Sequence, residues 1–328
     1  MKDIENALKE ELFKNFTGHG QRLTMMSKLV LSVLKMCTVN YAQLSICLNP
    51  LVKIASNFKR IQRFFKEYTF SAYNYVQFAW RLFENDNQWV ALSMDRTNWK
   101  FGKANINILT IGISYRGTAI PLVWMLLPKR GQSNQKERIE ILGRLLSYLS
   151  SHQKNKIRYL LMDREFGAYD WLCYLRKQPF HFIIRVRVDA KIRKAGQMKE
   201  TAAFKLFQTN NFKVLRNKRI IFGHRLFVAG CKISKSEYLI LISDQRLTHG
   251  RFLYKERWGI EVFFGACKKR GFNFEDTHQV IPERINNIIF ILAIAFVWAL
   301  KTGEMIMEQG VKIPVSYTHL TLPTICSV

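Results

Sequence analysis

Three apolar runs between residues 89 and 127 restrict the possible folds more than any other feature of this chain. They read WVALSM (89–94), NINILTIGISY (105–115) and AIPLVWMLL (119–127), and they are rich in β-branched residues. Such runs, punctuated by Gly and Pro, predict three neighbouring strands. The chain continues with a helical pattern, a strand ending at Asp163, a helix and a further strand that ends near residue 187. This order predicts an α/β fold with a mixed sheet flanked by helices.

The sequence on either side of these runs suggests the domain boundaries. Residues 1–85 have helical periodicity and form a predicted N-terminal helical region, while 86–187 form the first part of the core. Residues 188–245 contain RIIFGHRLFVAGCKI and EYLILIS, which predict antiparallel strands and therefore a β-rich insertion. Residues 246–312 return to the core with one long helix over 251–270 and an apolar helix later. Residues 313–328 lack a helical period and resemble translated sequencing-adapter text, so we expect a non-native tail.

The formal charge of +27 points to a polyanionic partner. About half of this charge lies between residues 176 and 235, where 16 Lys or Arg accompany only two acids. A basic block of this density is typical of phosphate binding. Arg185 and Arg187 in this block, together with Arg164, are candidate DNA contacts.

Nucleic acid is favoured over a membrane as the polyanion. The apolar run IIFILAIAFVWAL at 288–300 has 13 residues, too few to span a bilayer, and is expected to form a buried core helix. The first residues are polar and do not resemble a signal peptide. The six Cys are scattered without a C-x-x-C pair. We therefore expect a cytoplasmic, nucleoid-associated protein that binds double-stranded DNA and no membrane.

Two aspartates occur in the same context, each after an apolar strand and before an arginine. Asp95 lies in MDRTNW and Asp163 in MDREFG, and each is expected at the end of its strand. Two carboxylates held close together repel, and a divalent cation between them removes that cost. Oxygen-only ligands favour a hard ion, Mg²⁺ or Mn²⁺. A single strand-end Asp more often caps a turn, but the repeated context favours a functional pair.

The predicted helix over 251–270 supplies a third acid. At about 100° per residue, Glu261 shares one stripe with Tyr254, Arg257 and Lys268. A surface ion-pair stripe would give the same pattern, although the aromatic residues on this helix favour burial. Glu256 lies about 140° from Glu261 and is disfavoured. Glu165 is disfavoured too, because it lies only two residues after Asp163.

These motifs together resemble those of the DDE transposases of bacterial insertion sequences, over residues 88–300. The spacing Y-x₂-R-x₃-E-x₆-K from Tyr254 to Lys268 resembles the signature of the IS-four group. The resemblance implies a ribonuclease H-like core, with Asp95, Asp163 and Glu261 as catalytic residues and ligands of two Mg²⁺ ions. It implies that Arg257 and Lys268 hold DNA, with Tyr254 nearby, and that the N-terminal helices recognise transposon ends. We expect a homodimer in the DNA complex.

The reaction expected from this resemblance is cutting of transposon ends and joining of the freed 3′-hydroxyl to target DNA. Two alternatives remain at this point. One is a ribonuclease H-like nuclease that cuts without joining, and the other is an inactive remnant that only binds DNA.

Overall fold

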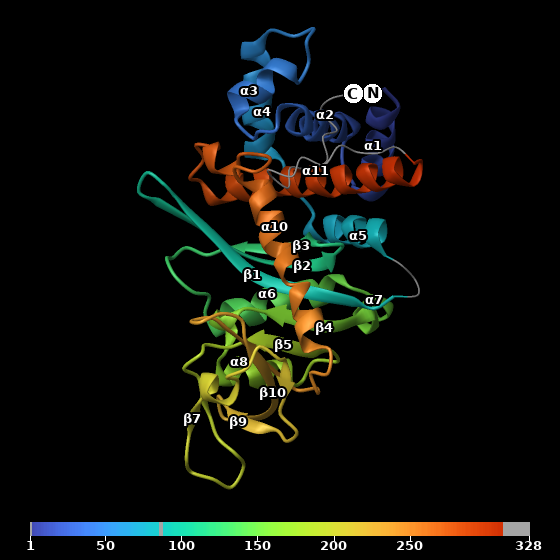
Figure 1. Ribbon diagram of the computed structural model, residues 1–328. Coiled ribbons are helices and arrows are strands. Elements are labelled where there is room, and N and C mark those ends of the chain that lie inside the picture. Colours follow the sequence, from blue (N-terminus) through green and yellow to red (C-terminus); the bar gives the residue numbers. More distant parts are fainter. Residues whose placement is uncertain (1, 85–87, 311–328) are drawn as a thin grey trace.

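Five helices precede the first strand in the computed structural model, which describes residues 2–84 and 88–310. They are α1 (Lys2–Asn15), α2 (Gly20–Met36), α3 (Tyr41–Cys47), α4 (Ile54–Glu67) and α5 (Ala72–Phe83). Figure 1 shows α1–α4 at one end of the molecule, beside the long helix α11 (Pro282–Glu308). The predicted helical N-terminal region is thus observed. The tail predicted at 313–328 lies outside the described residues.

A mixed sheet of nine strands, counted over the described residues, forms the centre of the molecule. Its main path runs β3-β2-β1-β4-β5-β11-β10-β8, and β9 pairs with β10. The strands β1, β4 and β5 are mutually parallel, whereas the other pairs are antiparallel. The bounds are β1 (Val90–Phe101), β2 (Ala104–Tyr115), β3 (Thr118–Leu126), β4 (Ile157–Met162), β5 (His181–Arg185), β8 (Lys213–Val214), β9 (Arg219–Ile221), β10 (His224–Lys232) and β11 (Tyr238–Ser243).

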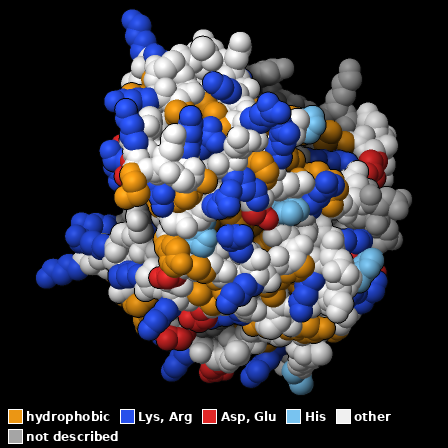
Figure 2. Space-filling view, turned by 90° about the horizontal axis from the view of Figure 1, so that it is seen from below, with side chains coloured by type: hydrophobic (Ala, Val, Ile, Leu, Met, Phe, Trp, Pro, Cys, Tyr) orange, Lys and Arg blue, Asp and Glu red, His pale blue; other side chains and the backbone are white. Residues whose placement is uncertain are grey.

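The strands of residues 188–245 extend the central sheet, because β11 pairs directly with β5. Between β5 and β8 lie a two-stranded sheet and a short helix: β6 (Lys191–Ile192), β7 (Thr201–Ala202) and η2 (Ala203–Leu206). Figure 1 shows β7, β9 and β10 at the end of the molecule opposite α1–α4. Seen from that end, Lys and Arg side chains spread over the surface and Asp and Glu are fewer (Figure 2).

The expectation that Asp95 ends its strand is wrong. Strand β1 continues to Phe101, because it forms a long hairpin with β2 in which Phe101 pairs with Ala104. What does end beside Asp95 is the parallel pairing with β4, whose last pair is Met94 with Met162. Asp95 and Asp163 therefore follow the same register pair, and the sheet itself brings them side by side.

The single helix predicted over 251–270 is also a correction. The structure has two helices, α9 (Gly250–Lys255) and α10 (Trp258–Cys267), which are separated at Glu256 and Arg257. The shorter helices α6 (Gln135–Tyr148), α7 (Ser151–Lys156), η1 (Arg164–Phe166), α8 (Tyr169–Leu175) and η3 (Phe274–Asp276) complete the described elements.

The apolar run at 288–300 lies in α11, which at 27 residues is longer than predicted. By length and composition this helix could cross a membrane, but 78% of its most apolar window is buried in the protein. Residues 288–299 are all buried, in contact with the sheet layer and the N-terminal helices. Burial of this kind agrees with the prediction of a core helix.

We predict that Gly259→Ala destabilises the protein, because α10 approaches β3 closely at this residue. A Cβ at Gly259 would lie 2.2 Å from the backbone oxygen of Thr118, so α10 would have to move. Overpacking of this kind lowers the free energy of unfolding by about 1–3 kcal/mol. Thermal and urea denaturation would measure the loss.

Gly265→Ala is the matched control on the same helix. Its new Cβ would lie 3.3 Å from Cδ of Arg270, a flexible side chain that can move aside. This variant should be as stable as the wild type, or more stable, because Ala favours a helix. Equal stability of Gly259→Ala and the wild type would contradict the packing described for α10.

Candidate active site

Asp95 and Asp163 lie on the same face of the sheet. Side chains alternate along a strand, and Ala91 of β1 and Tyr159 and Leu161 of β4 belong to one buried cluster that also includes Tyr254 of α9. Asp95 and Asp163 continue these two series, so both carboxylates reach the side on which α9 packs.

Two residues from the α9–α10 region contact these aspartates. The Tyr254 hydroxyl donates to Asp163 Oδ1 at 3.4 Å. The Arg257 guanidinium donates to Asp95 Oδ2 at 2.9 Å and to Glu261 Oε1 at 2.5 Å. Arg257 is only 5% exposed and therefore forms a buried bridge between β1 and α10. Three acids far apart in the sequence thus converge on two neighbouring side chains.

Burial dominates the electrostatics of Asp95. Desolvation raises the pKa of this carboxyl to about 6, against the lowering effects of Arg257 and of the Arg96 backbone N–H. The neighbouring Asp163 and Glu165 raise it further. Burial also raises the pKa of Tyr254, so that its hydroxyl stays protonated and remains a donor. The site therefore contains more negative charge than the buried Arg257 compensates, and a further cation would be favoured there.

The other predicted contacts are dispersed. Lys268 lies beyond the end of α10, where its Nζ donates to the backbone oxygen of Asn98 at 3.2 Å and pairs with Glu275 at 3.4 Å. Arg185 is bonded to the Tyr238 backbone oxygen at 3.1 Å, and its charge reaches Tyr254.

Arg164 and Arg187 form no ion pair with the three acids in the described part of the chain. Arg164 is exposed on η1. Arg187 is exposed as well and pairs with the nearby Asp189 at 3.2 Å. The structure thus brings Asp95, Asp163 and Glu261 together with Tyr254 and Arg257, and leaves the other predicted cations around them.

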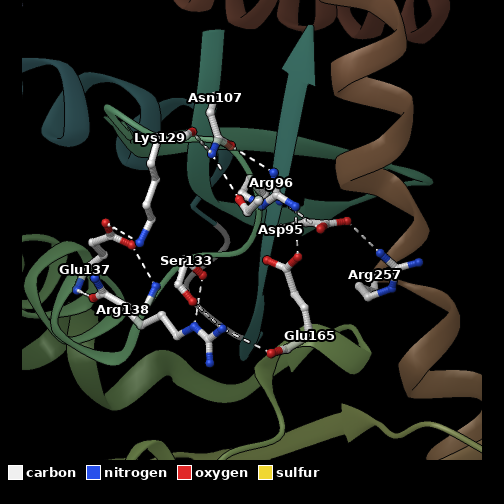
Figure 3. A network of polar contacts seen from close by, with 11 residues as sticks. Asp95, Arg96, Asn107, Lys129, Ser133, Glu137, Arg138, Glu165 and Arg257 are labelled. Carbon is white, nitrogen blue, oxygen red and sulfur yellow. Dashed lines mark hydrogen bonds and ion pairs between the residues drawn. The ribbon is translucent and has the colours of Figure 1, made fainter. Parts of the chain in front are cut away.

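A second polar network, which the sequence patterns did not predict, lies directly beside Asp95 (Figure 3). Arg96 donates to Glu165 Oε2 at 3.2 Å and to Asn107 Oδ1 at 2.9 Å. Arg138, which is 4% exposed, donates to the Glu165 backbone oxygen at 3.0 Å and to the Ser133 backbone oxygen at 2.6 Å. This network connects β1, β2 and α6 with η1, and so fixes the segment that follows Asp163.

Two sequence signals could have revealed this network. Arg138 occupies the apolar stripe of its helix, in line with Ile141, Leu142 and Leu145. An arginine in such a position must be buried and needs polar partners. The Arg that directly follows each aspartate is the other signal, because on a strand it must point to the face opposite its neighbour.

The donor set fits a hard divalent cation in its chemistry. Asp95, Asp163 and Glu261 offer only carboxylate oxygens, the ligands that Mg²⁺ and Mn²⁺ prefer. Within residues 2–84 and 88–310, however, no three His, Cys, Asp or Glu side chains are grouped closely enough to hold a metal ion. The guanidinium of Arg257 occupies the space between Asp95 and Glu261 instead. The acids therefore suit a metal ion only after Glu261 separates from Arg257.

The comparisons with known proteins agree on a single family. A family model described as "Transposase DDE domain" matches residues 93–298. Among solved structures, a piggyBac transposase synaptic complex with hairpin DNA is similar, with a TM-score of 0.50 and 11% identity, over 95% of this chain and 73% of that chain. This likeness confirms the predicted ribonuclease H-like mixed sheet flanked by helices. No curated protein matches the sequence significantly.

Two endonuclease V structures are more distantly similar. The catalytic domain of the human enzyme is 12% identical, with a TM-score of 0.29 over 79% of this chain and 98% of that one. The enzyme from Bacillus subtilis is 10% identical, with a TM-score of 0.27 over 72% of this chain and 94% of that one.

We predict that Asp95 makes the metal-free protein less stable as the pH rises from about 4 to about 6. Its folded pKa of about 6 lies above its ordinary value of 3.8, so the folded state holds the proton more tightly than the unfolded state. The stabilisation is complete below the unfolded pKa and disappears as the pH rises through the folded one. Melting temperatures of the wild type and Asp95→Asn between pH 4 and 7 would measure it. Parallel pH profiles for the two proteins would contradict the assignment.

Proposed function

The chain belongs to the transposase DDE domain family, and on that premise we propose that it cuts the ends of a mobile DNA segment and joins them to target DNA. The observation that carries this proposal is the convergence of Asp95, Asp163 and Glu261 on Tyr254 and Arg257. Three carboxylates around one buried arginine are costly for stability, and a phosphodiester substrate with a divalent cation accounts for them. The spacing from Tyr254 to Lys268 supports placement in the IS-four group.

Within this proposal, each residue has a defined task. Asp95, Asp163 and Glu261 would hold Mg²⁺ or Mn²⁺, which supplies stabilisation for the attacking and leaving oxygens, most simply as two ions. Arg257 balances the buried carboxylates in the free protein and turns to a phosphate when DNA is bound. Tyr254 holds the Asp163 carboxylate in place. Lys268, anchored near Asn98, would contact the DNA backbone beside the site.

The two chemical steps differ only in the nucleophile. Water attacks the phosphorus at the end of the mobile segment, and the bond to the 3′-oxygen breaks, which releases a 3′-hydroxyl. That hydroxyl then attacks a phosphodiester of the target, and a target 3′-oxygen leaves. Joining two ends to one target requires two active sites, which supports a homodimer in the DNA complex. Such a protein would act at the nucleoid.

We predict that Glu261→Gln abolishes cleavage of end DNA in Mg²⁺, by several orders of magnitude. The substitution keeps the shape of the side chain and removes a carboxylate ligand. DNA binding should persist, because the variant has one negative charge fewer near the phosphates. A gel assay with an end-bearing duplex would measure both nicking and joining to a second plasmid.

The control for this experiment is Glu256→Gln. Glu256 ends α9, and in the described part of the chain no ion pair joins it to a site residue, so this variant should cut at nearly the wild-type rate. Wild-type cleavage in excess chelator would contradict the metal-dependent mechanism. Nicking without joining would indicate a nuclease, and binding without nicking would indicate an inactive remnant.

We predict that the basic block at 176–235 supplies phosphate contacts. Lys194, Arg216 and Lys218 are exposed there. Changing all three to Gln should reduce the slope of log affinity against log salt concentration by about 0.9 for each phosphate that the variant no longer neutralises. Fluorescence anisotropy at a series of salt concentrations would measure the slope. An unchanged slope would move the DNA-binding surface elsewhere.

A further inference from the structure

The N-terminal helices carry a positive charge that the catalytic site does not use. Between Glu11 and Glu67 the chain has nine Lys or Arg and not a single Asp or Glu. Five of these nine lie in or directly before α4, namely Lys53, Lys59, Arg60, Arg63 and Lys66. An acid-free segment of this length concentrates a positive field on one part of the surface.

The two faces of α4 differ sharply. Ile61, Phe64 and Phe65 are buried, and Phe65 stacks on Tyr41 of α3 at 5.0 Å. The opposite side exposes a stripe of four residues that fall within about 80° of one another around the helix. We call them the α4 stripe: Ser56, Lys59, Arg63 and Lys66. The three cations of the stripe form no hydrogen bond or ion pair within residues 2–84 and 88–310, so they are available to an external partner.

A buried asparagine fixes the start of α4. Asn57 is completely buried, and its amide donates to the backbone oxygens of Ser45 at 3.1 Å and Asn49 at 2.9 Å. These bonds connect the first turn of α4 to the end of α3 and to the turn between the helices. The helix end is thus rigidly placed, as a helix must be if it reads a sequence through direct contacts.

The same end of α4 is exposed and carries small and apolar side chains. Leu51 in the turn is 96% exposed and Ile54 is 57% exposed, with Ala55 and Ser56 next to them. Figure 1 shows α3 and α4 at the extreme end of the molecule, so a duplex can approach them. Apolar side chains contact thymine methyl groups, and Ser, Lys and Arg bond to base edges in the major groove.

We propose that α4 is the recognition helix of this protein and lies in the major groove of the DNA ends, with α3 across the backbone. This inference rests on the proposed function, since it takes the ends of the mobile DNA as the partner. The first turn of α4, with Ser56 and Lys59, contacts base edges, as in other helix-turn-helix arrangements. Arg63 and Lys66, further along the α4 stripe, contact phosphates.

An acidic membrane surface is the other polyanion that suits a basic helix. It fits less well, because the apolar face of α4 is already covered by its own protein: Ile61, Phe64 and Phe65 have no surface left to insert. Leu51 and Ile54 alone offer too small an apolar area for stable insertion.

Selection from a duplex library with about 20 randomised base pairs, on the full-length protein in excess chelator, tests the proposal. The wild type should enrich a sequence motif. Lys59→Gln should relax the base preference at one position of it by about tenfold. Lys66→Gln should weaken binding to all sequences alike and lower the salt slope by about 0.9. Lys136→Gln removes an exposed lysine from α6 and should change neither the motif nor the affinity for the enriched duplex.

Absence of a motif with the wild type, or the same motif and affinity with Lys59→Gln, would overturn the proposal. So would binding to anionic lipid vesicles that depends on Lys59 and Lys66 more than DNA binding does. Melting temperatures show whether each variant is folded. Because selection requires binding but no cleavage, a motif that depends on α4 can be found even if Mg²⁺-dependent cleavage fails. Conversely, cleavage with a motif indifferent to α4 would overturn only this inference.

Discussion

The buried guanidinium of Arg257 is the interaction on which the site depends. It bonds to Asp95 on the central strand and to Glu261 on α10, and so connects the sheet to the helix that covers it. A charge this deeply buried is tolerated only with close partners. The break between α9 and α10 occurs at this residue, and the break turns Tyr254 and Arg257 toward the two aspartates. Secondary structure, packing and the candidate chemistry therefore meet at one side chain.

A buried cation of this kind also explains how three carboxylates can coexist in the free protein. Arg257 lowers the pKa of Asp95, although burial raises it more strongly. On the opposite face of β1, Arg96 forms an ion pair with Glu165. Two arginines thus separate neighbouring acids on the two faces of one strand. In the proposed function, the arginine on the catalytic face yields to a metal ion and DNA, while the Arg96–Glu165 pair stays as a support.

The sequence was sufficient for the order of the elements and for the convergence of the acids. Period-2 apolar runs located β1, β2, β3, β4 and β5, and the repeated MDR context pointed to Asp95 and Asp163. It was not sufficient for the ends of β1 or for the break after α9. Strand β1 outlasts its apolar run because hairpin pairing with β2 stabilises residues up to Phe101. The break at Glu256 and Arg257 lacks a Gly or Pro signal, and tertiary contacts of Arg257 decide it.

The central claim, that Asp95, Asp163 and Glu261 form one metal site, is tested most directly by Fe²⁺ in place of Mg²⁺. Bound iron with ascorbate and peroxide generates radicals that cut the polypeptide near its ligands, and mass spectrometry locates the cuts. We expect cuts near Asp95, Asp163 and Glu261 together, suppressed by Mg²⁺ and absent in Asp163→Asn. Cuts confined to other segments, or cuts unaffected by Asp163→Asn, would contradict the claim.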